Sequence, residues 1–484
     1  MGKKIIPWGI SLFLLSPCIV LVFLLHHWAM PSWGELFWAL GNSILQSFFS
    51  ALFALGLGFV VALGAIRLSP ERFVLKSIFD ILCLVTQFIP VVVSLVAILN
   101  LIEPFPNGIL GMVIVHVFLN FGLAAILLSQ HMKTVWGETS DMARTLGVTR
   151  FLYWRKAGLP LIKKELGLIF LYLFSLFFTS FSVPLIVGGG RGTTLEILIY
   201  EKMRLSLDWS AAVVLAWVQV AFIFILSFLA IRNRTNVTPR NANIQWLGSY
   251  AGVFVLLILM ASLFAGYSSG LVEGWIQRRD LSLYMNDLGW GFLNSIMLGL
   301  ITFVFVMVIF EGLSWVGIIP EWLDRFLNGY LAPSTSLTCF AFLILLPAEP
   351  IWSYFKIPLA FVILSAPALY RMGFGERLKD LHHQIEQAKI LGAEDGAIFN
   401  EVTWPQIKSH ARFLGALVAT WACGDFAVAR ILSTKDFTLG LITQTLLSTY
   451  RSSLASVVSV LLLLACLSCF FLIMGWDYVD RRKS

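Results

Sequence analysis

The chain has 484 residues, of which 58% are hydrophobic and 13% are charged. Soluble globular domains have roughly 45–50% apolar and about 25% charged residues, so this composition excludes a soluble protein. The net charge of +7 does not indicate a nucleic-acid partner, because lysine and arginine gather in the cytoplasmic loops of membrane proteins. The composition predicts an all-α polytopic membrane protein.

A transmembrane helix needs about 20 apolar residues to cross roughly 30 Å of hydrocarbon. About twelve apolar runs meet this requirement and predict about twelve transmembrane helices. In chain order they lie near residues 5–27, 40–66, 79–102, 108–130, 166–188, 211–231, 246–267, 290–312, 333–349, 352–371, 411–432 and 454–476. The ninth and tenth runs are interrupted by Pro347, Pro350 and Pro358, so the sequence does not define where these two spans end.

The first run follows the charged start MGKK, as the apolar segment of a signal peptide does. No small-residue cleavage site follows it, so we expect this segment to remain as the first span. Basic residues mark one side of the twelve-span arrangement: Lys3, Lys4, Arg67, Arg72, Lys76, the cluster at 133–164, Arg232, Arg234, Arg240 and the tail DRRKS. By the positive-inside rule this side is cytoplasmic, and both termini lie on it.

Two predicted cytoplasmic loops share one pattern: DMARTLGVTRFLYWRKAGLP at 141–160 and EQAKILGAEDGAIFNEVTWP at 386–405. Each has an acid, then alanine two residues on, glycine six residues on and proline nineteen residues on. The matching residues are Asp141, Ala143, Gly147 and Pro160 in the first loop, and Glu386, Ala388, Gly392 and Pro405 in the second. The pattern predicts a short helix ended by a glycine at positive φ, then a second short helix ended by the proline.

Further pairs of short motifs indicate that the two halves are repeats. NSI at 42–44 recurs at 294–296, and TL at 194–195 recurs at 438–439. Phe181 and Phe426 have the same spacing of 245 as the two loop glycines. Six spans per half leave both halves facing the same way, so we expect two parallel six-helix repeats. They would comprise residues 1–235 and 236–484, with a polar linker near 232–245.

Two similar helix–glycine–helix units on the cytoplasmic face would suit a dimeric cytoplasmic partner. The small Ala143 and Ala388 would let its surface approach, and Asp141 and Glu386 would offer carboxylates to basic groups. The alternative is that both loops only complete the membrane interface. Finding the same spacing twice, in matching places, favours the partner.

These loops resemble the EAA loop of the permeases of binding-protein-dependent ABC importers with the type I fold. In that family the loop forms a coupling helix that docks into the ATP-hydrolysing subunit. Asp141 replaces the usual glutamate, Met142 and Gln387 replace the first alanine, and Trp404 replaces the usual leucine. Two such units in one chain resemble the fused permeases for ferric iron and for thiamine.

The resemblance implies a transport subunit in the bacterial inner membrane, without enzyme activity or a cofactor of its own. It implies, as partners, a cytoplasmic ATP-binding cassette subunit in two copies, an extracytoplasmic solute-binding protein, the lipid bilayer and a small solute. A different class remains open, an ion-gradient-driven secondary transporter with parallel repeats. Such a transporter would need several ionisable groups inside the membrane, and the sequence offers Asp425 and His116.

Asp425, in CGDFAVAR, is a carboxylate within an apolar run and therefore a functional candidate. We interpret it either as a possible pore residue or as a structural partner of Arg430. The segment VGGGRGTT at 187–194 lacks the lysine of a phosphate-binding loop and is expected to be an outer loop. The run GLGFVVALG predicts close helix packing at Gly56, Gly58 and Gly64.

Cysteine and histidine residues give no metal-binding pattern. His382 and His383 adjoin a polar loop and are expected to be solvated. The cysteines lie in apolar runs and are expected to be small buried hydrophobes: Cys18, Cys83, Cys339, Cys423, Cys466 and Cys469.

Overall fold

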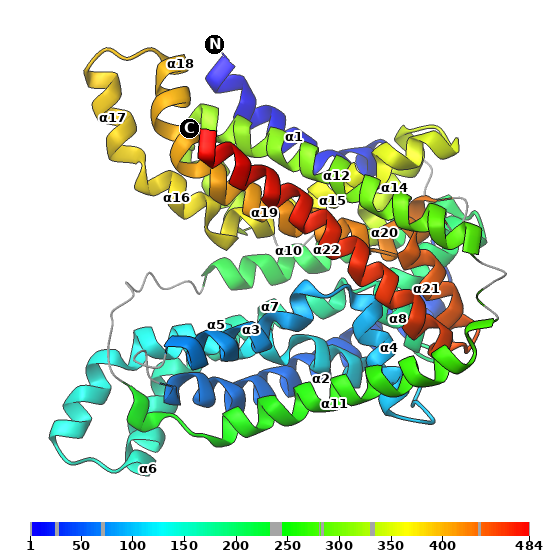
Figure 1. Ribbon diagram of the computed structural model, residues 1–484, viewed down its shortest axis with the longest axis horizontal. Helices are drawn as coiled ribbons and strands as arrows, with labels where there is room; N and C mark the ends of the chain where they lie inside the picture. Colours follow the sequence, from blue (N-terminus) through cyan, green and yellow to red (C-terminus); the bar gives the residue numbers. More distant parts are fainter. Residues whose placement is uncertain are drawn as a thin grey trace. The chain divides into compact units, whose positions relative to one another are not determined.

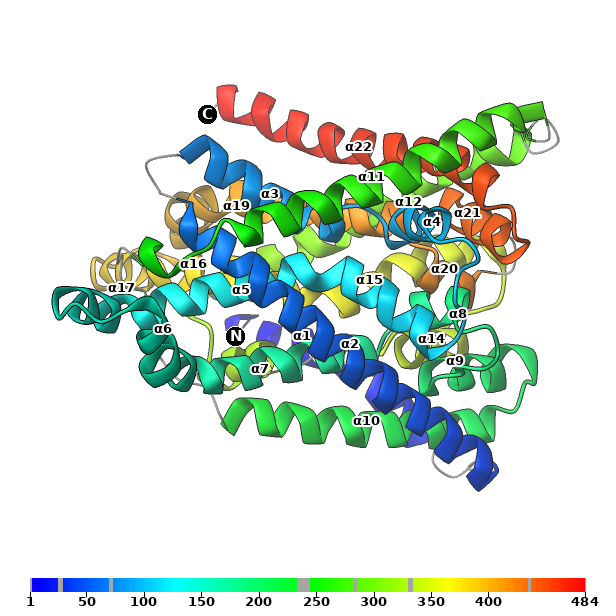
Figure 2. The same ribbon diagram turned by 90° about the horizontal axis from the view of Figure 1, so that it is seen from below.

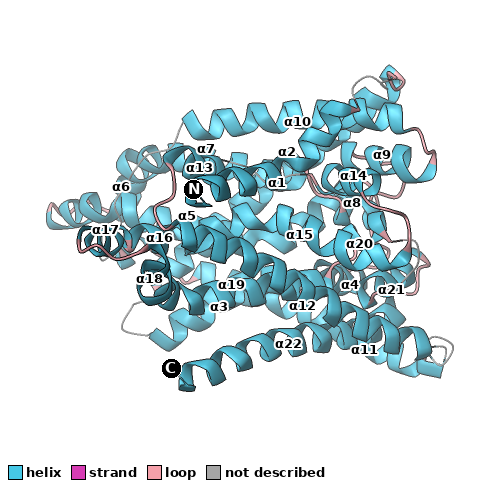
Figure 3. Cartoon of the chain, turned by 90° about the horizontal axis from the view of Figure 1, so that it is seen from above, coloured by secondary structure: helices cyan, strands magenta, loops and turns pink. Residues whose placement is uncertain are grey.

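The computed structural model of the chain describes residues 2–24, 29–68, 73–232, 244–279, 281, 285–329, 334–433 and 437–483. The regular secondary structure within these ranges is helical, without any strand (Figure 3). The predicted all-α class is therefore confirmed. Arg72, Arg234 and Arg240, and most of the predicted linker at 232–245, lie outside the described residues.

The helices of the first half are α1 (Gly2–Phe23), α2 (Trp33–Arg67), α3 (Phe73–Phe88), α4 (Val91–Leu101), α5 (Ile109–Thr145), α6 (Arg150–Tyr153), α7 (Leu159–Phe178), α8 (Ser182–Val187), α9 (Leu195–Tyr200) and α10 (Trp209–Arg232). Those of the second half are α11 (Ala251–Ile276), α12 (Met285–Val316), α13 (Glu321–Gly329), α14 (Thr335–Leu345), α15 (Ser353–Leu369), α16 (Gly375–Asp380), α17 (His382–Ile390), α18 (Asp395–Ala397), α19 (Trp404–Gly424), α20 (Ala427–Leu432), α21 (Leu439–Ser448) and α22 (Ser452–Lys483).

Within the described residues, eight helical segments are long and apolar enough to cross a membrane. They are Ile5–Phe23, Trp33–Arg67, Ile109–Gly137, Trp209–Leu226, Ala251–Ile276, Met285–Val316, Pro350–Ile390 and Ser452–Tyr478. A ninth results if α3 and α4 are counted as one bent span. A polytopic membrane protein is thus confirmed, whereas the predicted number of twelve spans is not.

The predicted span at 79–102 is broken at Pro90. The chain bends by 99° between α3 and α4, and Pro90 has the extended ψ of 137° that places it before the first turn of α4. Proline lacks an amide hydrogen and therefore fits at a helix start but not inside a helix. The hydropathy of the run is continuous across this break, which is why the sequence predicted a single span.

Three further predicted spans are also shorter or interrupted. The run at 333–349 forms only the 11-residue helix α14. The run at 166–188 is divided between α7 and α8, and the run at 411–432 is divided between α19 and α20. The two divisions fall at corresponding places in the two halves, next to Phe181 and Phe426.

The helices form two compact units that are not continuous in sequence. Unit 1 comprises Met1–Trp33, Glu196–Val220 and Gln277–Ser484, and unit 2 comprises Gly34–Leu195 and Ala221–Ile276. In unit 1, α12, α19 and α22 run side by side (Figure 1), and α1 packs against α12 and α14. In unit 2, α11 extends along α3 and α4 (Figure 2). The first helix of each half therefore packs with the helices of the other half.

Small residues permit close helix packing in unit 2. A Cβ atom added at Gly64 would lie 2.7 Å from the backbone nitrogen of Val253 on α11, and one at Gly58 would lie 2.6 Å from the Cβ of Ala124 on α5. The predicted packing role is confirmed for these two glycines. Gly56, in the same run, has nothing within 4 Å of such a Cβ, so the prediction is wrong for Gly56.

Candidate functional site

The first predicted loop begins at the end of α5, which runs without a break for 37 residues. Its last turn ends at Gly147, where φ is +67°. The Gly147 amide donates to the Arg144 carbonyl (3.1 Å), and the Val148 amide donates to the Ala143 carbonyl (3.0 Å). These two hydrogen bonds define a Schellman motif, which satisfies the last carbonyls of a helix.

The second predicted loop ends its helix in the same way. Gly392 follows α17 with φ of +82°. The Gly392 amide donates to the Lys389 carbonyl (3.0 Å), and the Ala393 amide donates to the Ala388 carbonyl (3.0 Å). The predicted positive φ is confirmed at both glycines. No atom lies within 4 Å of a Cβ built on either one, so glycine is required by the backbone conformation and not by lack of space.

The prolines do not end the second helix of each loop, and this part of the prediction is wrong. After Gly147 the chain enters α6, a π-helical segment at Trp154–Gly158 and then α7, which has Pro160 in its first turn. After Gly392 it enters α18, a π-helical segment at Ile398–Thr403 and then α19, which has Pro405 in its first turn. A π-turn shifts the hydrogen-bond register, so the helix continues past a residue that has no amide hydrogen to donate.

Aromatic residues join the two arms of the first loop, which are the end of α5 and the segment from α6 to α7. The Trp136 indole donates to the Gly158 carbonyl (3.0 Å), and its ring lies edge-on to Trp154, 4.8 Å away between centroids. The hydroxyl groups of Thr139 and Tyr153 are 2.8 Å apart. This loop is therefore a braced helical hairpin, which projects beyond the rest of unit 2 (Figure 1).

The second loop is braced by a different set of residues. The Gln406 amide donates to the Gln384 side-chain oxygen (2.6 Å). Phe399 contacts Trp315 at the end of α12 (5.1 Å between centroids) and stacks on Trp404 (5.8 Å). The helices α16, α17 and α18 extend from the rest of unit 1 as a second hairpin (Figure 1).

The predicted contact residues lie at the ends of these hairpins. Asp141 and Glu386 are exposed, and Ala143 and Ala388 are half-buried. The Glu386 carboxylate is 3.1 Å from the His382 ring nitrogen one turn earlier. Among the described residues, no group of three or more histidine, cysteine or acidic side chains is arranged to hold a metal ion.

Large apolar side chains at the hairpin tips are the feature that the sequence prediction missed. Their side chains are exposed to between 66% and 85%: Met142, Leu146 and Phe151 in the first loop, and Ile390 and Leu391 in the second. The signal was available, because Leu146 and Leu391 directly precede the loop glycines. An apolar patch on a polar protrusion is typical of a protein-binding surface.

The repeated NSI and TL motifs meet each other in the first half. The Asn42 side chain donates to the Thr193 carbonyl (3.1 Å), and the Leu195 amide donates to the Ser43 hydroxyl oxygen (2.8 Å). These hydrogen bonds join α2 to the start of α9.

The second half repeats this pair of hydrogen bonds. The Asn294 side chain donates to the Phe437 carbonyl (2.9 Å), and the Leu439 amide donates to the Ser295 hydroxyl oxygen (3.1 Å). The Asn294 oxygen also accepts from the Tyr354 hydroxyl (2.7 Å). Motifs that the sequence paired by similarity therefore make the same contacts in both halves.

Asp425 lies between α19 and α20. One of its carboxylate oxygens accepts hydrogen bonds from the amides of Val428 (2.7 Å) and Ala429 (3.4 Å) in the first turn of α20. It therefore caps the helix that follows the break, which is a structural role. Asn and Asp are equally good at this position because both offer a side-chain oxygen.

A capping role and a pore role for Asp425 predict different effects of its substitution on uptake and stability. We expect Asp425→Asn to accumulate normally and to retain uptake, because the amide oxygen still accepts from Val428. Asp425→Ala leaves these amides unpaired, at a cost of about 1 kcal/mol, and should lower the thermal midpoint of the purified protein. Loss of uptake in Asp425→Asn at a normal protein level would instead show that the negative charge itself is needed.

A second buried acid, Glu196, was missed by the sequence prediction. It follows TL of the first half and is fully buried in unit 1. Its two carboxylate oxygens accept from the Gln219 side chain (2.8 Å) and from the Ser336 amide at the start of α14 (3.1 Å). Like Asp425, Glu196 thus accepts a hydrogen bond from an amide at the start of a helix. Both of its carboxylate oxygens accept hydrogen bonds.

Comparison with known proteins finds relatives along nearly the whole chain. The chain is 25% identical over 478 residues to the thiamine transport system permease protein of Haemophilus influenzae, covering 91% of this chain and 87% of that protein. It is 24% identical over 480 residues to the protein of the same name from Escherichia coli K12, covering 89% and 87%. A shorter segment of 134 residues, 27% of this chain and 25% of the relative, is 34% identical to the Brucella abortus protein of that name.

Neither a protein-family model nor a solved structure matches the chain. The similarity to these permeases, which are named as transport subunits and not as enzymes, supports the resemblance to fused importer permeases.

Proposed function

We propose that the chain is the inner-membrane permease of an ABC importer and that its solute is thiamine. The assignment as an importer permease is supported by relatives that cover about nine-tenths of the chain. The proposal of thiamine as the solute rests on the names of these relatives. The fused architecture alone suggested either thiamine or ferric iron, and these names favour thiamine.

The observation that carries the coupling mechanism is the pair of hairpins with the same glycine cap. Each ends in exposed apolar side chains directly before a glycine at positive φ. We propose that each tip docks into an ATP-binding cassette subunit, in two copies, with Asp141 and Glu386 beside basic groups of the partner. An extracytoplasmic binding protein delivers the solute to the opposite face.

In this mechanism the hairpins transmit force and perform no chemistry. Closing of the ATPase dimer on ATP draws the two tips together. The braced arms carry this motion into α5 and α7, and into α16 and α19, and switch the solute pathway between the two sides of the membrane.

An ion-gradient-driven transporter is less well supported. Such a protein needs ionisable groups inside the membrane that are free to exchange a proton or an ion. The oxygens of Glu196 and one oxygen of Asp425 are engaged by helix-end amides or a glutamine. The His116 ring is buried and packs at a tilt against Phe177, 4.6 Å away between centroids.

Uptake of labelled thiamine tests the proposed solute. In cells that lack their own thiamine transporter, the chain together with its ATPase and binding protein should restore uptake, and ATP depletion should abolish it. Labelled ferric iron serves as the competing solute. ATP-dependent uptake of iron without thiamine would refute the solute, and uptake without any ATPase partner would refute the importer.

Reporter fusions test the proposed orientation. Fusions after Ser69, Lys164, Asn236 and Ser484 should report the cytoplasm, and fusions after Asn107 and Glu273 should report the outside. Ser69, Asn236 and Ser484 lie outside the described residues, so these positions rest on the charge pattern alone. An external signal at Asn236 would contradict two parallel repeats of residues 1–235 and 236–484.

A further inference from the structure

The two hairpins differ in how their leading helix reaches the tip. In unit 2, α5 runs straight to Gly147 as one continuous helix. In unit 1 the corresponding path is broken, because Met372 and Gly373 leave helical geometry and Gly373 has φ of +107°. The direction of α17 is therefore not fixed by the direction of α15, and something else must set it.

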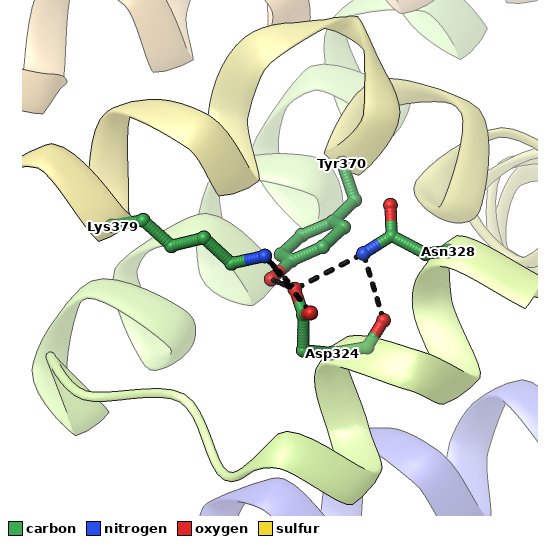
Figure 4. Close-up of polar contacts among 4 residues, drawn as sticks. All are labelled: Asp324, Asn328, Tyr370 and Lys379. Atoms are coloured by element: carbon green, nitrogen blue, oxygen red, sulfur yellow. Dashed lines mark hydrogen bonds and ion pairs between the residues drawn. The ribbon is translucent and has the colours of Figure 1, made fainter. Parts of the chain in front are cut away.

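Asp324, on the separate helix α13, contacts both sides of this kink (Figure 4). The Tyr370 hydroxyl, before the kink, donates to Asp324 Oδ1 (2.7 Å). The Lys379 ammonium, after the kink, donates to Asp324 Oδ2 (2.9 Å) and lies 2.8 Å from Oδ1. Asn328, one turn along α13, donates to the same carboxylate (3.0 Å) and fixes its rotamer.

The helix that carries Asp324 is itself anchored in unit 1. Leu323 and Leu327 of α13 are buried, and Trp322 stacks on Trp8 of α1 with 4.5 Å between ring centroids. The α17 side is anchored by the buried Ile385, whose side chain lies 3.4 Å from a Cβ built on Gly317, and by Gln384, which accepts from the Gln406 amide (2.6 Å). Asp324 thus joins α13 to both sides of the kink at Gly373.

The carboxylate is suited to a permanent link. Burial raises the pKa of Asp324, but hydrogen bonds from Lys379 and Tyr370 outweigh burial and leave the pKa below its ordinary value. Asp324 therefore stays ionised at neutral pH, and the charged form accepts the strongest hydrogen bonds.

The corresponding region of the first half has a charge pair within a single helix. On α3, which packs against α5, Asp80 pairs with Lys76 one turn earlier. Lys133 of α5 precedes Gly147 much as Lys379 precedes Gly392. Because α5 is unbroken, it does not depend on this contact for its direction.

We propose that Asp324 is a positioning residue that sets the angle of the second coupling helix, α17, by fixing both sides of the Gly373 kink to α13. This inference rests on the proposed docking of that hairpin to an ATPase. Without Asp324, α17 would pivot at Gly373, and the tip residues Ile390 and Leu391 would be presented at variable angles.

The direct test measures the position of α17 in the full-length protein. Spin labels on Arg325→Cys in α13 and His383→Cys in α17, both at exposed positions, report the distance distribution between the two helices. The parent protein without introduced cysteines gives the background from its native thiols. We expect Asp324→Ala and Asp324→Asn to broaden the distribution and Asp324→Glu to restore most of it. An unchanged distribution in Asp324→Ala and Asp324→Asn would overturn the proposal.

Transport by the assembled importer gives the second readout. Asp324→Asn should lower the maximal uptake rate about fivefold or more with little change in KM, because solute binding is untouched while coupling is loosened. Exchange of the charges in Asp324→Lys with Lys379→Asp should recover part of this loss. Failure of both Asp324→Glu and the exchanged pair to recover any activity would overturn the positioning role.

The control is Glu321→Gln on the same helix. Glu321 pairs with Arg325 one turn later, and both side chains are more than 70% exposed, so the change should leave uptake and folding normal. Glu321→Gln is tested in the transport assay only, in protein that keeps Arg325. A broadened distribution together with normal uptake in Asp324→Asn would support the link at Gly373 and refute the proposed coupling function of the hairpin, so the two failures are distinguishable.

Discussion

Replacing Gly147 or Gly392 by valine is expected to abolish most uptake while the protein still accumulates in the membrane. Both glycines have positive φ, a conformation that costs an L-residue about 1–2 kcal/mol and a β-branched one more. Each valine would disrupt the Schellman cap and turn the tip away from its docking angle. Co-purification of the ATPase and solute uptake, measured for each variant at equal protein level, check this expectation.

Gly396→Val is the matched control in the second hairpin. Gly396 also has nothing within 4 Å of a built Cβ, but its φ is not positive, so only a small helix-propensity cost remains. We expect Gly392→Val to be at least as damaging as Gly147→Val, because the neighbouring Trp404 is fixed by its stacking on Phe399. Normal ATPase binding and uptake in both glycine variants would remove the main support for the coupling mechanism.

Gly64→Leu is expected to prevent folding, whereas Gly56→Leu in the same run should be tolerated. A Cβ at Gly64 meets the backbone of α11 at 2.7 and 2.8 Å, and one at Gly252 meets the Val60 carbonyl oxygen of α2 at 2.2 Å. Backbone atoms cannot move aside as a flexible side chain can, so α11 must separate from α2. Overpacking of this kind typically costs 1–3 kcal/mol or more.

Yield in membranes and size-exclusion profiles after detergent extraction measure this difference. Gly56→Leu controls for added hydrophobicity, because that position has open space around it. A normal profile for Gly64→Leu would show that α2 and α11 do not pack closely in unit 2.

The coupling hairpins could be predicted because their geometry is local. A glycine at a fixed distance from an acid and an alanine specifies the end of a helix, and the hydrogen bonds of the cap span only six residues. The same reasoning failed at Pro160 and Pro405. A proline close after a short helix indicates an end only if the hydrogen-bond register stays α-helical, and the π-helical segments change that register.

The number of spans could not be predicted from hydropathy, because breaks in a membrane protein need not interrupt an apolar run. The amides exposed at a break must find partners within the protein. Asp425 supplies such a partner after α19, and Ser43 and Ser295 supply partners to Leu195 and Leu439. These polar residues are few within longer apolar stretches, so their effect on mean hydropathy is small.

Contacts between residues far apart in the sequence could not be predicted for another reason. Nothing in the composition of α13 shows that Asp324 meets Tyr370 and Lys379, since the three residues belong to separate elements joined only by the fold. The exposed apolar tips could have been predicted, because an apolar pair such as Ile390 and Leu391 in a polar loop is visible in the sequence itself.

The exchange of first helices between the two units has a consequence for biosynthesis. α1 leaves the ribosome long before α12 and α14, yet it packs against both of them in unit 1. At about 5–20 residues per second, it waits in the bilayer on the order of 10–50 s before α12, which begins at Met285, has been made. Unit 2 likewise stays incomplete until α11 arrives. Neither half of the gene therefore encodes a finished unit, and a ribosome that stops at the linker leaves α1 without α12 and α14, and α2 to α5 without α11.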